Sequence, residues 1–214
     1  ATTFPAGPPA RGISQRWRRR IFRSLAVVVL LGLIASWIVA SLLVSPASQE
    51  IGAPPAVFRA ESISLASDSG STIRGWHHRA AQPKGVVVLL HGMRGNRLTI
   101  LARARVLRAA AYSIVMIDLQ AHGESTGQNV TLGHLEQYDV KAAVEFARQE
   151  HPSEAIAVIA VIGVSLGGAS AVVASPLGID ALVLEAVFPN ISVAIQNRVA
   201  EQLRVLSTIP AELL

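Results

Sequence analysis

The sequence of 214 residues contains no cysteine, only 5% of its residues are aromatic, and only 15% are charged. The lack of cysteine excludes disulfide bonds, thiolate catalysis and zinc sites built on thiolates. Sites built on histidine and carboxylate side chains stay open. Hydrophobic residues make up 51% of the chain, which excludes a wholly disordered protein because it suffices for a packed core. We therefore expect one domain with an appendage.

Acidic residues are absent from the first 24 residues, which contain six arginines. The formal net charge of +5 arises in this segment, because the remaining chain has 13 basic groups against 14 acidic groups. Proteins bind nucleic acids largely by neutralising phosphates with a basic surface. A nearly neutral body offers no such surface, and we expect no nucleic-acid partner.

Charge is also absent from residues 25–44, a run of twenty mostly aliphatic residues. A helix of this length spans about 30 Å, the thickness of the hydrocarbon core of a bilayer. Since positively charged flanks remain in the cytoplasm, we expect a single-pass membrane helix after a basic, disordered cytoplasmic tail at 1–24. A proline-rich linker at 45–57 would then lead to a body outside the cytoplasm.

Three alternatives to this anchor stay open. A cleaved signal peptide would end near the small residues 45–47, although its apolar region usually has only about 7–15 residues. The pair Arg19-Arg20 also fits a twin-arginine export signal. An apolar helix can instead be buried in a protein core, but the six adjacent arginines oppose that interpretation.

The body alternates between predicted strands and helices. A turn at 68–70 between two strand-like runs predicts an antiparallel hairpin. The hairpin strands are expected at 58–66 and 72–79. Four buried strands are expected at 86–90, 113–119, 156–162 and 181–187, and three helices at 97–111, 135–149 and 169–175. This order predicts an α/β fold with a mostly parallel sheet, helices on both faces, and ligands at the carboxyl ends of the strands. A last amphipathic helix is expected at 191–206.

The segment from Gly163 to Gly168 follows a predicted strand and precedes a predicted helix. A sharp turn at such a place leaves no room for side chains beside a nucleophile, and Gly163 and Gly167 meet this requirement. Ser165 is then the candidate nucleophile at the edge of the sheet. The N–H of Leu166, at the start of the helix, is a candidate donor to an oxyanion.

A second loop, His91-Gly-Met-Arg-Gly-Asn96, follows the strand at 86–90. Its glycines, Gly92 included, allow a tight turn close to a substrate carbonyl, and the N–H of Met93 is the candidate second oxyanion donor. His91 directly follows a buried strand, and we expect it to brace the loop by hydrogen bonding rather than to act as a general base.

Four segments in this order, at 91–96, 118–125, 163–168 and 182–190, resemble the α/β-hydrolase superfamily, in particular its esterase-like and peptidase-like serine hydrolases. The resemblance covers residues 58–190, with 191–214 as the start of a cap or covering helix. It implies hydrolysis of a small carboxylic ester, thioester or amide through an acyl-enzyme on Ser165, without a metal or other cofactor.

Several other polar residues are expected to have structural roles. The resemblance implies that His122, Gly123 and Ser125 shape a loop near the active site. Asp118, at the end of its strand, and Asp139, near the start of its helix, are expected to hydrogen-bond nearby backbone. The remaining histidines have no metal-ligand spacing and are expected to be surface or packing residues; they are His77, His78, His134 and His151.

A base and an acid for Ser165 are missing at the places that this fold requires. The order in the fold is Ser, acid, His, yet no histidine follows His151. Glu185 ends a predicted strand, but the resemblance does not make it the triad acid. We therefore expect a hydrolase truncated after its sixth core strand and nearly inert at this length. The alternative is a non-catalytic, membrane-tethered binding or scaffold protein.

Overall fold

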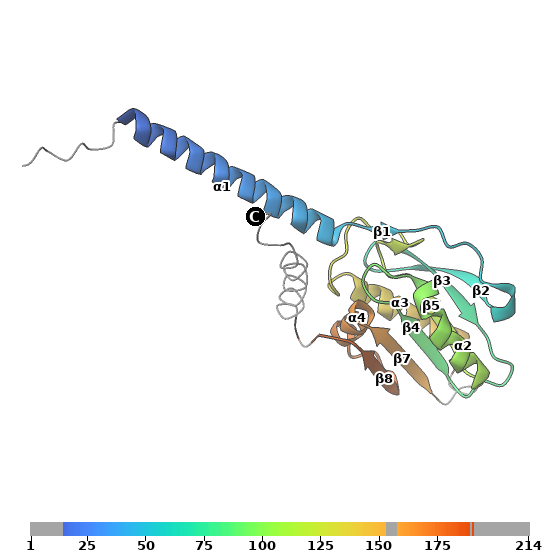
Figure 1. Ribbon diagram of the computed structural model, residues 1–214. Coiled ribbons are helices and arrows are strands. Elements are labelled where there is room, and N and C mark those ends of the chain that lie inside the picture. Colours follow the sequence, from blue (N-terminus) through green and yellow to red (C-terminus); the bar gives the residue numbers. More distant parts are fainter. Residues whose placement is uncertain (1–14, 153–157, 189, 191–214) are drawn as a thin grey trace, which may run out of the picture. The chain divides into compact units, whose positions relative to one another are not determined.

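The computed structural model describes residues 15–152, 158–188 and 190, in two compact units, Ala1–Leu43 and Val44–Leu214 (Figure 1). The predicted helix at 191–206 lies outside the described residues. The described part of the first unit is helix α1, Gln15–Val44. The last residue of this helix, Val44, is assigned to the second unit. The second unit contains the sheet and all the predicted site residues.

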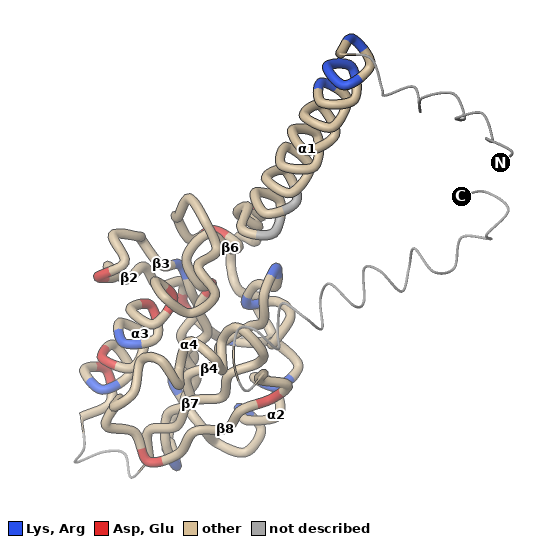
Figure 2. Tube along the Cα trace, turned by 90° about the vertical axis from the view of Figure 1, so that its left-hand side faces the viewer, with Lys and Arg blue, Asp and Glu red and all other residues tan. Residues whose placement is uncertain are grey.

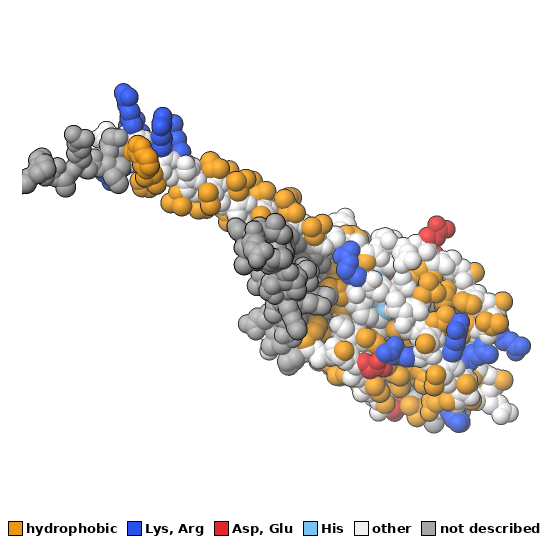
Figure 3. All heavy atoms as spheres, viewed as in Figure 1, with side chains coloured by type: hydrophobic (Ala, Val, Ile, Leu, Met, Phe, Trp, Pro, Cys, Tyr) orange, Lys and Arg blue, Asp and Glu red, His pale blue; other side chains and the backbone are white. Residues whose placement is uncertain are grey.

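Helix α1 is long and apolar enough to cross a membrane. Exposed hydrophobic side chains lie along the helix (Figure 3), and arginines cluster at its N-terminal end (Figure 2). The helix begins ten residues before the predicted span, so residues 15–24 are helical and their assignment to a disordered tail is wrong. These ten residues contain neither glycine nor proline, and glutamine and arginine are good helix formers.

The second unit is built on a six-stranded sheet in the order β2-β3-β5-β4-β7-β8. Strands β2 and β3 form the predicted antiparallel hairpin, β3 also pairs antiparallel with β5, and all other neighbours are parallel. The strands are β2 Glu61–Ala66, β3 Thr72–His78, β4 Val86–Leu90, β5 Ser113–Ile117, β7 Ile159–Val164 and β8 Ala181–Glu185.

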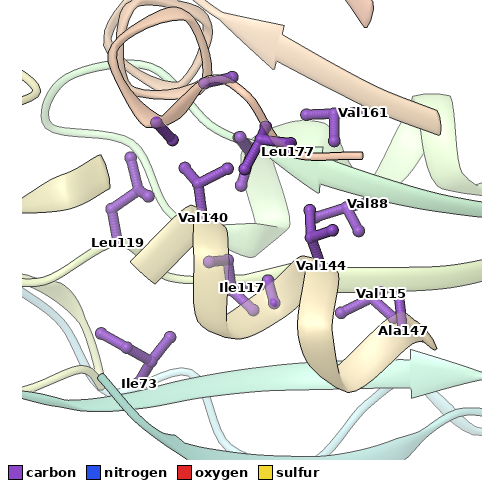
Figure 4. Packing of buried hydrophobic residues seen from close by; sticks show 14 of the residues in the cluster. Ile73, Val88, Val115, Ile117, Leu119, Val140, Val144, Ala147, Val161 and Leu177 are labelled. Carbon is purple, nitrogen blue, oxygen red and sulfur yellow. The ribbon is translucent and has the colours of Figure 1, made fainter. Parts of the chain in front are cut away.

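Helices cover both faces of this sheet, as predicted. They are the 3-10 helix η2 Arg97–Ile100, followed by α2 Leu101–Ala109, and the α-helices α3 Glu136–Glu150 and α4 Leu166–Ala174. Because side chains alternate along a strand, Val86, Val88 and Leu90 pack in the cluster of α3 and α4 (Figure 4), while Val87 and Leu89 pack in that of α2. The alternation explains why strand β4 is apolar at every position.

Three details differ from the prediction. Strand β7 starts at Ile159 and runs through Gly163 to Val164, since the turn begins only at Ser165. The segment 45–57, predicted to be an extended linker, contains strand β1 Ala47–Ser48 and enters the 3-10 helix Ala56–Phe58. Strand β8 is exposed rather than buried, because it is the last strand of the described sheet and pairs only with β7 there.

Candidate active site

Ser165 lies on a tight turn between strand β7 and helix α4. Its φ of 48° and ψ of −110° are a conformation that residues with a side chain rarely adopt, and one that persists only where the surroundings enforce it. Two hydrogen bonds hold this turn. The N–H of Ser165 donates to the carbonyl of Glu185 at 2.8 Å, and the N–H of Gly167 donates to the carbonyl of His91 at 3.1 Å. The turn is therefore tied to the strands on both sides of β7.

Glycine is required on both sides of Ser165 because backbone lies too close for any side chain. A Cβ at Gly163 would lie 2.5 Å from the Cα of Gly168, and a Cβ at Gly167 would lie 2.7 Å from the carbonyl oxygen of His91. Real Cβ atoms do not approach other heavy atoms this closely. This is the steric pattern that the sequence predicted for a nucleophile turn.

The loop after β4 lies against Ser165. A Cβ at Gly92 would stand 3.5 Å from the Cβ of Ser165, an ordinary van der Waals separation, so the loop packs directly against the turn. Leu166 is the first residue of α4, and its N–H therefore has no acceptor within the helix. Met93, next to Gly92, packs against the larger hydrophobic cluster. The use of the Leu166 and Met93 N–H groups as oxyanion donors stays a prediction.

His91 is fully buried and both of its ring nitrogens are engaged. Its Nε2 accepts a hydrogen bond from the N–H of Leu119 at 3.0 Å, and its Nδ1–H donates to the carbonyl of Gly92 at 2.7 Å. Burial lowers the pKa of His91 to about 3. A neutral imidazole with both nitrogens committed cannot take a proton from Ser165, and it braces the loop instead.

The loop that follows β5 packs beside the His91 loop. His122 is buried, and burial lowers its pKa. Ser125 donates its hydroxyl to the carbonyl of Asp118 at 2.6 Å and accepts from the N–H of Arg74 at 2.8 Å. Gly123 has a φ of 51°, and a Cβ there would collide with the carboxylate of Asp118. These contacts fix the shape of the loop.

The segment after α1 docks on this same loop, a contact that sequence reasoning missed. Strand β1 pairs in parallel with β6, His122–Gly123. The N–H of Ala47 donates to Ala121 and that of Gln49 to Gly123, both at 2.8 Å, and the side chain of Gln49 accepts from Asn96. We call residues 45–52 the strap. Only a lack of regular pattern marked it in the sequence, so no signal there could have located its partner.

The carboxylates near the loops are committed to structural contacts. Asp118 is buried, pairs with the guanidinium of Arg97 and accepts from the N–H groups of Arg97 and Glu124. Burial raises the pKa of Asp118 against these contacts. Asp139 is equally buried and accepts from Ser67, Ser69 and the N–H of Gln120, and burial raises its pKa to about 6.

Glu185 lies close to Ser165 through its backbone only. Its carboxylate forms an ion pair with Arg103 on α2, and the hydrogen bonds from Arg103 lower the pKa of Glu185. A triad acid must instead orient a histidine. No imidazole touches Glu185 in the part of the chain that the structure describes.

The remaining histidines contact other groups or are exposed. His77 and His151 are buried and their Nε2 atoms are 3.0 Å apart, His78 contacts the carbonyl of Arg59, and His134 is exposed. Among residues 15–152 and 158–188, no group of three or more His, Asp or Glu side chains could hold a metal ion. Within the same ranges the Ser165 hydroxyl makes no hydrogen bond, so no base contacts it there.

Several solved structures similar to this chain are described as esterases or hydrolases. An esterase of Pyrococcus furiosus, Pf2001, matches in one crystal form with a TM-score of 0.54, 25% identity and coverage of 60% of this chain and 51% of that one. Another crystal form gives a TM-score of 0.64, 20% identity and coverage of 80% and 64%. An α/β serine hydrolase without a lid, from Xanthomonas campestris, matches with a TM-score of 0.52, 19% identity and coverage of 63% of each chain. The chain thus spans between about half and two thirds of the length of these structures.

No curated protein sequence matches the chain. Residues 81–213 match the sequence family described as serine aminopeptidase, S33. That match covers more than half of the chain, including the loop after β4, the loop after β5 and the turn at Ser165. The mostly parallel sheet belongs to a fold that this chain shares with the structure of TM-score 0.64. The chain therefore belongs to the serine aminopeptidase S33 family, within the α/β-hydrolase superfamily.

Proposed function

We propose that this protein is a serine hydrolase that cleaves a carboxylic ester, thioester or amide through an acyl-enzyme on Ser165. The observation that carries the proposal is the strained turn at Ser165, at the carboxyl end of β7 and against Gly92. Strain of this kind gathers at functional sites. The similarity to a Pyrococcus furiosus protein described as an esterase supports esters as the first substrates to test.

The reaction follows from the placement of groups around this turn. The Oγ of Ser165 attacks the carbonyl carbon and loses its proton to a base, and the carbonyl oxygen becomes an oxyanion. The N–H groups of Leu166 and Met93 are the proposed donors to that oxyanion. The alcohol, thiol or amine then departs with a proton, and water releases the acid from Ser165 by the same route.

The general base of such a reaction is a histidine that follows the serine in the chain. This sequence contains no histidine after Ser165. His91 and His122 have both ring nitrogens in hydrogen bonds, so neither replaces it. We therefore expect the 214-residue chain to hydrolyse esters slowly, since triad enzymes lose most of their rate when a triad member is removed.

Added imidazole tests the proposal on this chain. The measurement is the rate of p-nitrophenyl acetate hydrolysis by the wild-type chain and by Ser165→Ala, in detergent, with and without imidazole. We expect similar slow rates without imidazole, and a saturable excess in the wild type when imidazole supplies the base. Mass spectrometry should then find the acetyl group on the peptide that contains Ser165.

The matched control is Ser175→Ala, which removes a hydroxyl at the other end of α4. It should retain the imidazole-dependent rate. Equal rates for wild type and Ser165→Ala at every imidazole concentration, with no acetylated Ser165, would refute the acyl-enzyme and favour the alternative, a non-catalytic binding or scaffold protein.

We further propose that residues 25–44 anchor the protein in a membrane, with the N-terminus in the cytoplasm and the hydrolase body outside. The support is the charge pattern, since arginines precede the apolar run and none interrupts it. The absence of cysteine makes the test direct. A membrane-impermeant maleimide should label Lys84→Cys in intact cells and Gln15→Cys only after lysis. The reverse pattern, or labelling of neither variant in the membrane fraction, would refute the orientation or the anchor.

A further inference from the structure

A cleft of about 480 Å³ lies at the β2–β3 end of the sheet. Strands β5 and β4 separate β3 from β7, so at the usual strand spacing the cleft is about 14 Å or more from the turn at Ser165. Its lining is mostly polar and includes Ser62, Ser64, Arg74, Arg97 and Glu124. It is therefore a separate site from the one proposed for hydrolysis.

The hairpin places three hydrogen-bond donors of the cleft on one face. Ser64 pairs directly with Arg74 across the two strands, and Ser62 pairs with Trp76. Directly paired residues share a face, and so do residues two apart on a strand. The hydroxyls of Ser62 and Ser64 and the guanidinium of Arg74 thus stand next to one another. Within the described residues, no side chain forms an ion pair or hydrogen bond with the Arg74 guanidinium.

Arg97 also lines the cleft, and it has a donor without an acceptor. The side chain is almost fully buried, packs over the ring of Trp76, and forms ion pairs with Asp118 and Glu124. Its Nε has no hydrogen-bond partner in the described part of the chain. Buried donors nearly always have a partner, so the contacts of Arg97 with the described residues leave one of its donors unsatisfied.

Glu124 limits the charge that the cleft accepts. Its carboxylate receives hydrogen bonds from the N–H groups of Gly52 at 2.7 Å and Ile51 at 2.9 Å, and from Arg97. The bond from Gly52 is the largest of several contacts that lower the pKa of Glu124 to about 2. Glu124 is therefore ionised at neutral pH, and it opposes a ligand with a second negative charge.

We propose that this cleft binds the carboxylate of a small organic monocarboxylic acid. The planar guanidinium of Arg74 matches a carboxylate with two parallel hydrogen bonds, and Ser62 and Ser64 donate to its remaining lone pairs. The volume lies within the range of small-molecule sites.

Isothermal titration calorimetry of the full chain in detergent micelles tests the proposal, with butyrate as the probe. Butyramide has the same shape without the charge, succinate has two charges, and inorganic phosphate tests a different anion. We expect butyrate to bind, butyramide not to bind, and succinate and phosphate to bind more weakly than butyrate. Absence of butyrate binding, equal binding of butyramide, or tighter binding of phosphate would overturn the proposal.

Substitutions locate the binding on the protein. Arg74→Gln should weaken butyrate binding about tenfold or more, as expected for the loss of a charge-assisted pair of hydrogen bonds. Joint replacement of Ser62 and Ser64 by alanine should weaken it severalfold. Arg105→Gln, on α2 and outside the cleft, is the matched control and should bind like the wild type.

Equal affinity in wild type and Arg74→Gln would overturn the site even if butyrate binds elsewhere. Circular dichroism and thermal unfolding of each variant check that the fold is retained, which we expect because Ser62, Ser64 and Arg74 are all exposed. Ser165→Ala should bind butyrate as the wild type does. The binding result therefore does not depend on whether Ser165 hydrolyses esters.

Discussion

The Nε2 atom of His122 accepts a hydrogen bond of 3.0 Å from the backbone N–H of Arg94, and so joins the loop after β5 to the loop after β4. The Nδ1–H of the same ring donates to the carbonyl of Gln120 at 2.9 Å. A ring that accepts at one nitrogen and donates at the other is neutral. Arg94 follows Met93 in the chain, so His122 positions the loop that contains the predicted second oxyanion donor.

Replacing His122 by phenylalanine tests this positioning role. The variant keeps a ring of similar size but leaves the N–H of Arg94 without its acceptor, which costs about 1–3 kcal/mol of stability. We expect kcat of the imidazole-dependent ester hydrolysis to fall about tenfold, with a smaller change in KM, because a displaced donor weakens oxyanion stabilisation. Steady-state kinetics of the wild type and the variant provide the measurement.

Two further variants sharpen this comparison. His134→Phe, at an exposed position, should leave kcat unchanged. His122→Asn retains a side-chain oxygen that can accept from Arg94, and it should recover part of the lost rate. A folded His122→Phe protein with the kcat of the wild type would show that His122 does not position the loop.

The contact between His77 and His151 predicts a dependence of stability on pH. Burial lowers the pKa of both, that of His151 from 6.5 to about 4. Below pH 6.5 the unfolded chain therefore binds a proton that the folded chain does not bind. The free energy of unfolding should be fully retained above pH 6.5 and should fall as the pH falls toward 4.

Urea denaturation at several pH values across this range measures the effect. Other charged groups face the pair: Glu61, at 3.1 Å from Nδ1 of His77, and Arg79 and Glu150 around it. These charged groups are still present in the variant His151→Gln, which removes only the imidazole of His151. The variant should show a shallower loss of stability between pH 6.5 and 4. Parallel curves for wild type and His151→Gln would exclude His151 as a source of the pH dependence.

Strands and the nucleophile turn were predictable because they depend on local sequence. The run Val86–Leu90 has no polar residue, and a β-branched run this short between turn residues favours a strand buried on both faces. Gly163 was equally predictable, since its steric conflict is with Gly168, within six residues of chain, whereas Gly167 meets His91 of a distant loop. The bounds of β7 were less so, because the strand begins at Ile159 and includes Gly163, which the sequence assigns to the turn.

Contacts between distant segments were not predictable, because no local pattern encodes them. The strap pairs with His122–Gly123 through backbone atoms. This pairing does not require a particular side chain at Ala47 or Ser48, so the sequence there does not indicate it. His77 and His151 are 74 residues apart, and each looks like an isolated polar residue in its own segment. Arg97 begins a predicted helix and looks exposed, yet its partners Asp118 and Glu124 bury it.

This burial predicts a large difference between two arginines. Arg97→Met leaves the buried carboxylate of Asp118 without its partner, and we expect a loss of about 3–5 kcal/mol of unfolding free energy. Arg103→Met breaks an ion pair with Glu185 in which both side chains are about 40% exposed, and should cost only about 0–1 kcal/mol. Chemical denaturation of both variants at neutral pH gives the comparison.

The double variant Arg97→Met with Asp118→Asn should be more stable than Arg97→Met alone, because the amide removes the unpaired charge. Similar losses for Arg97→Met and Arg103→Met would contradict the buried ion pair. An Arg97→Met protein that is as stable as the wild type would also contradict it.

The turn at Ser165 gives the last prediction, which concerns sterics rather than charge. A Cβ at Gly163 would lie 2.5 Å from the N and Cα atoms of Gly168, and backbone cannot move away as a flexible side chain can. Gly163→Ala should therefore lose about 1–3 kcal/mol of unfolding free energy, the usual cost of overpacking, and should displace Ser165. Gly32→Ala in α1, where a Cβ would meet nothing within 4 Å, is the control and should lose nothing. Denaturation and imidazole-dependent hydrolysis measure both effects, and a Gly163→Ala protein that matches the wild type in both would disprove the close approach of β7 and α4.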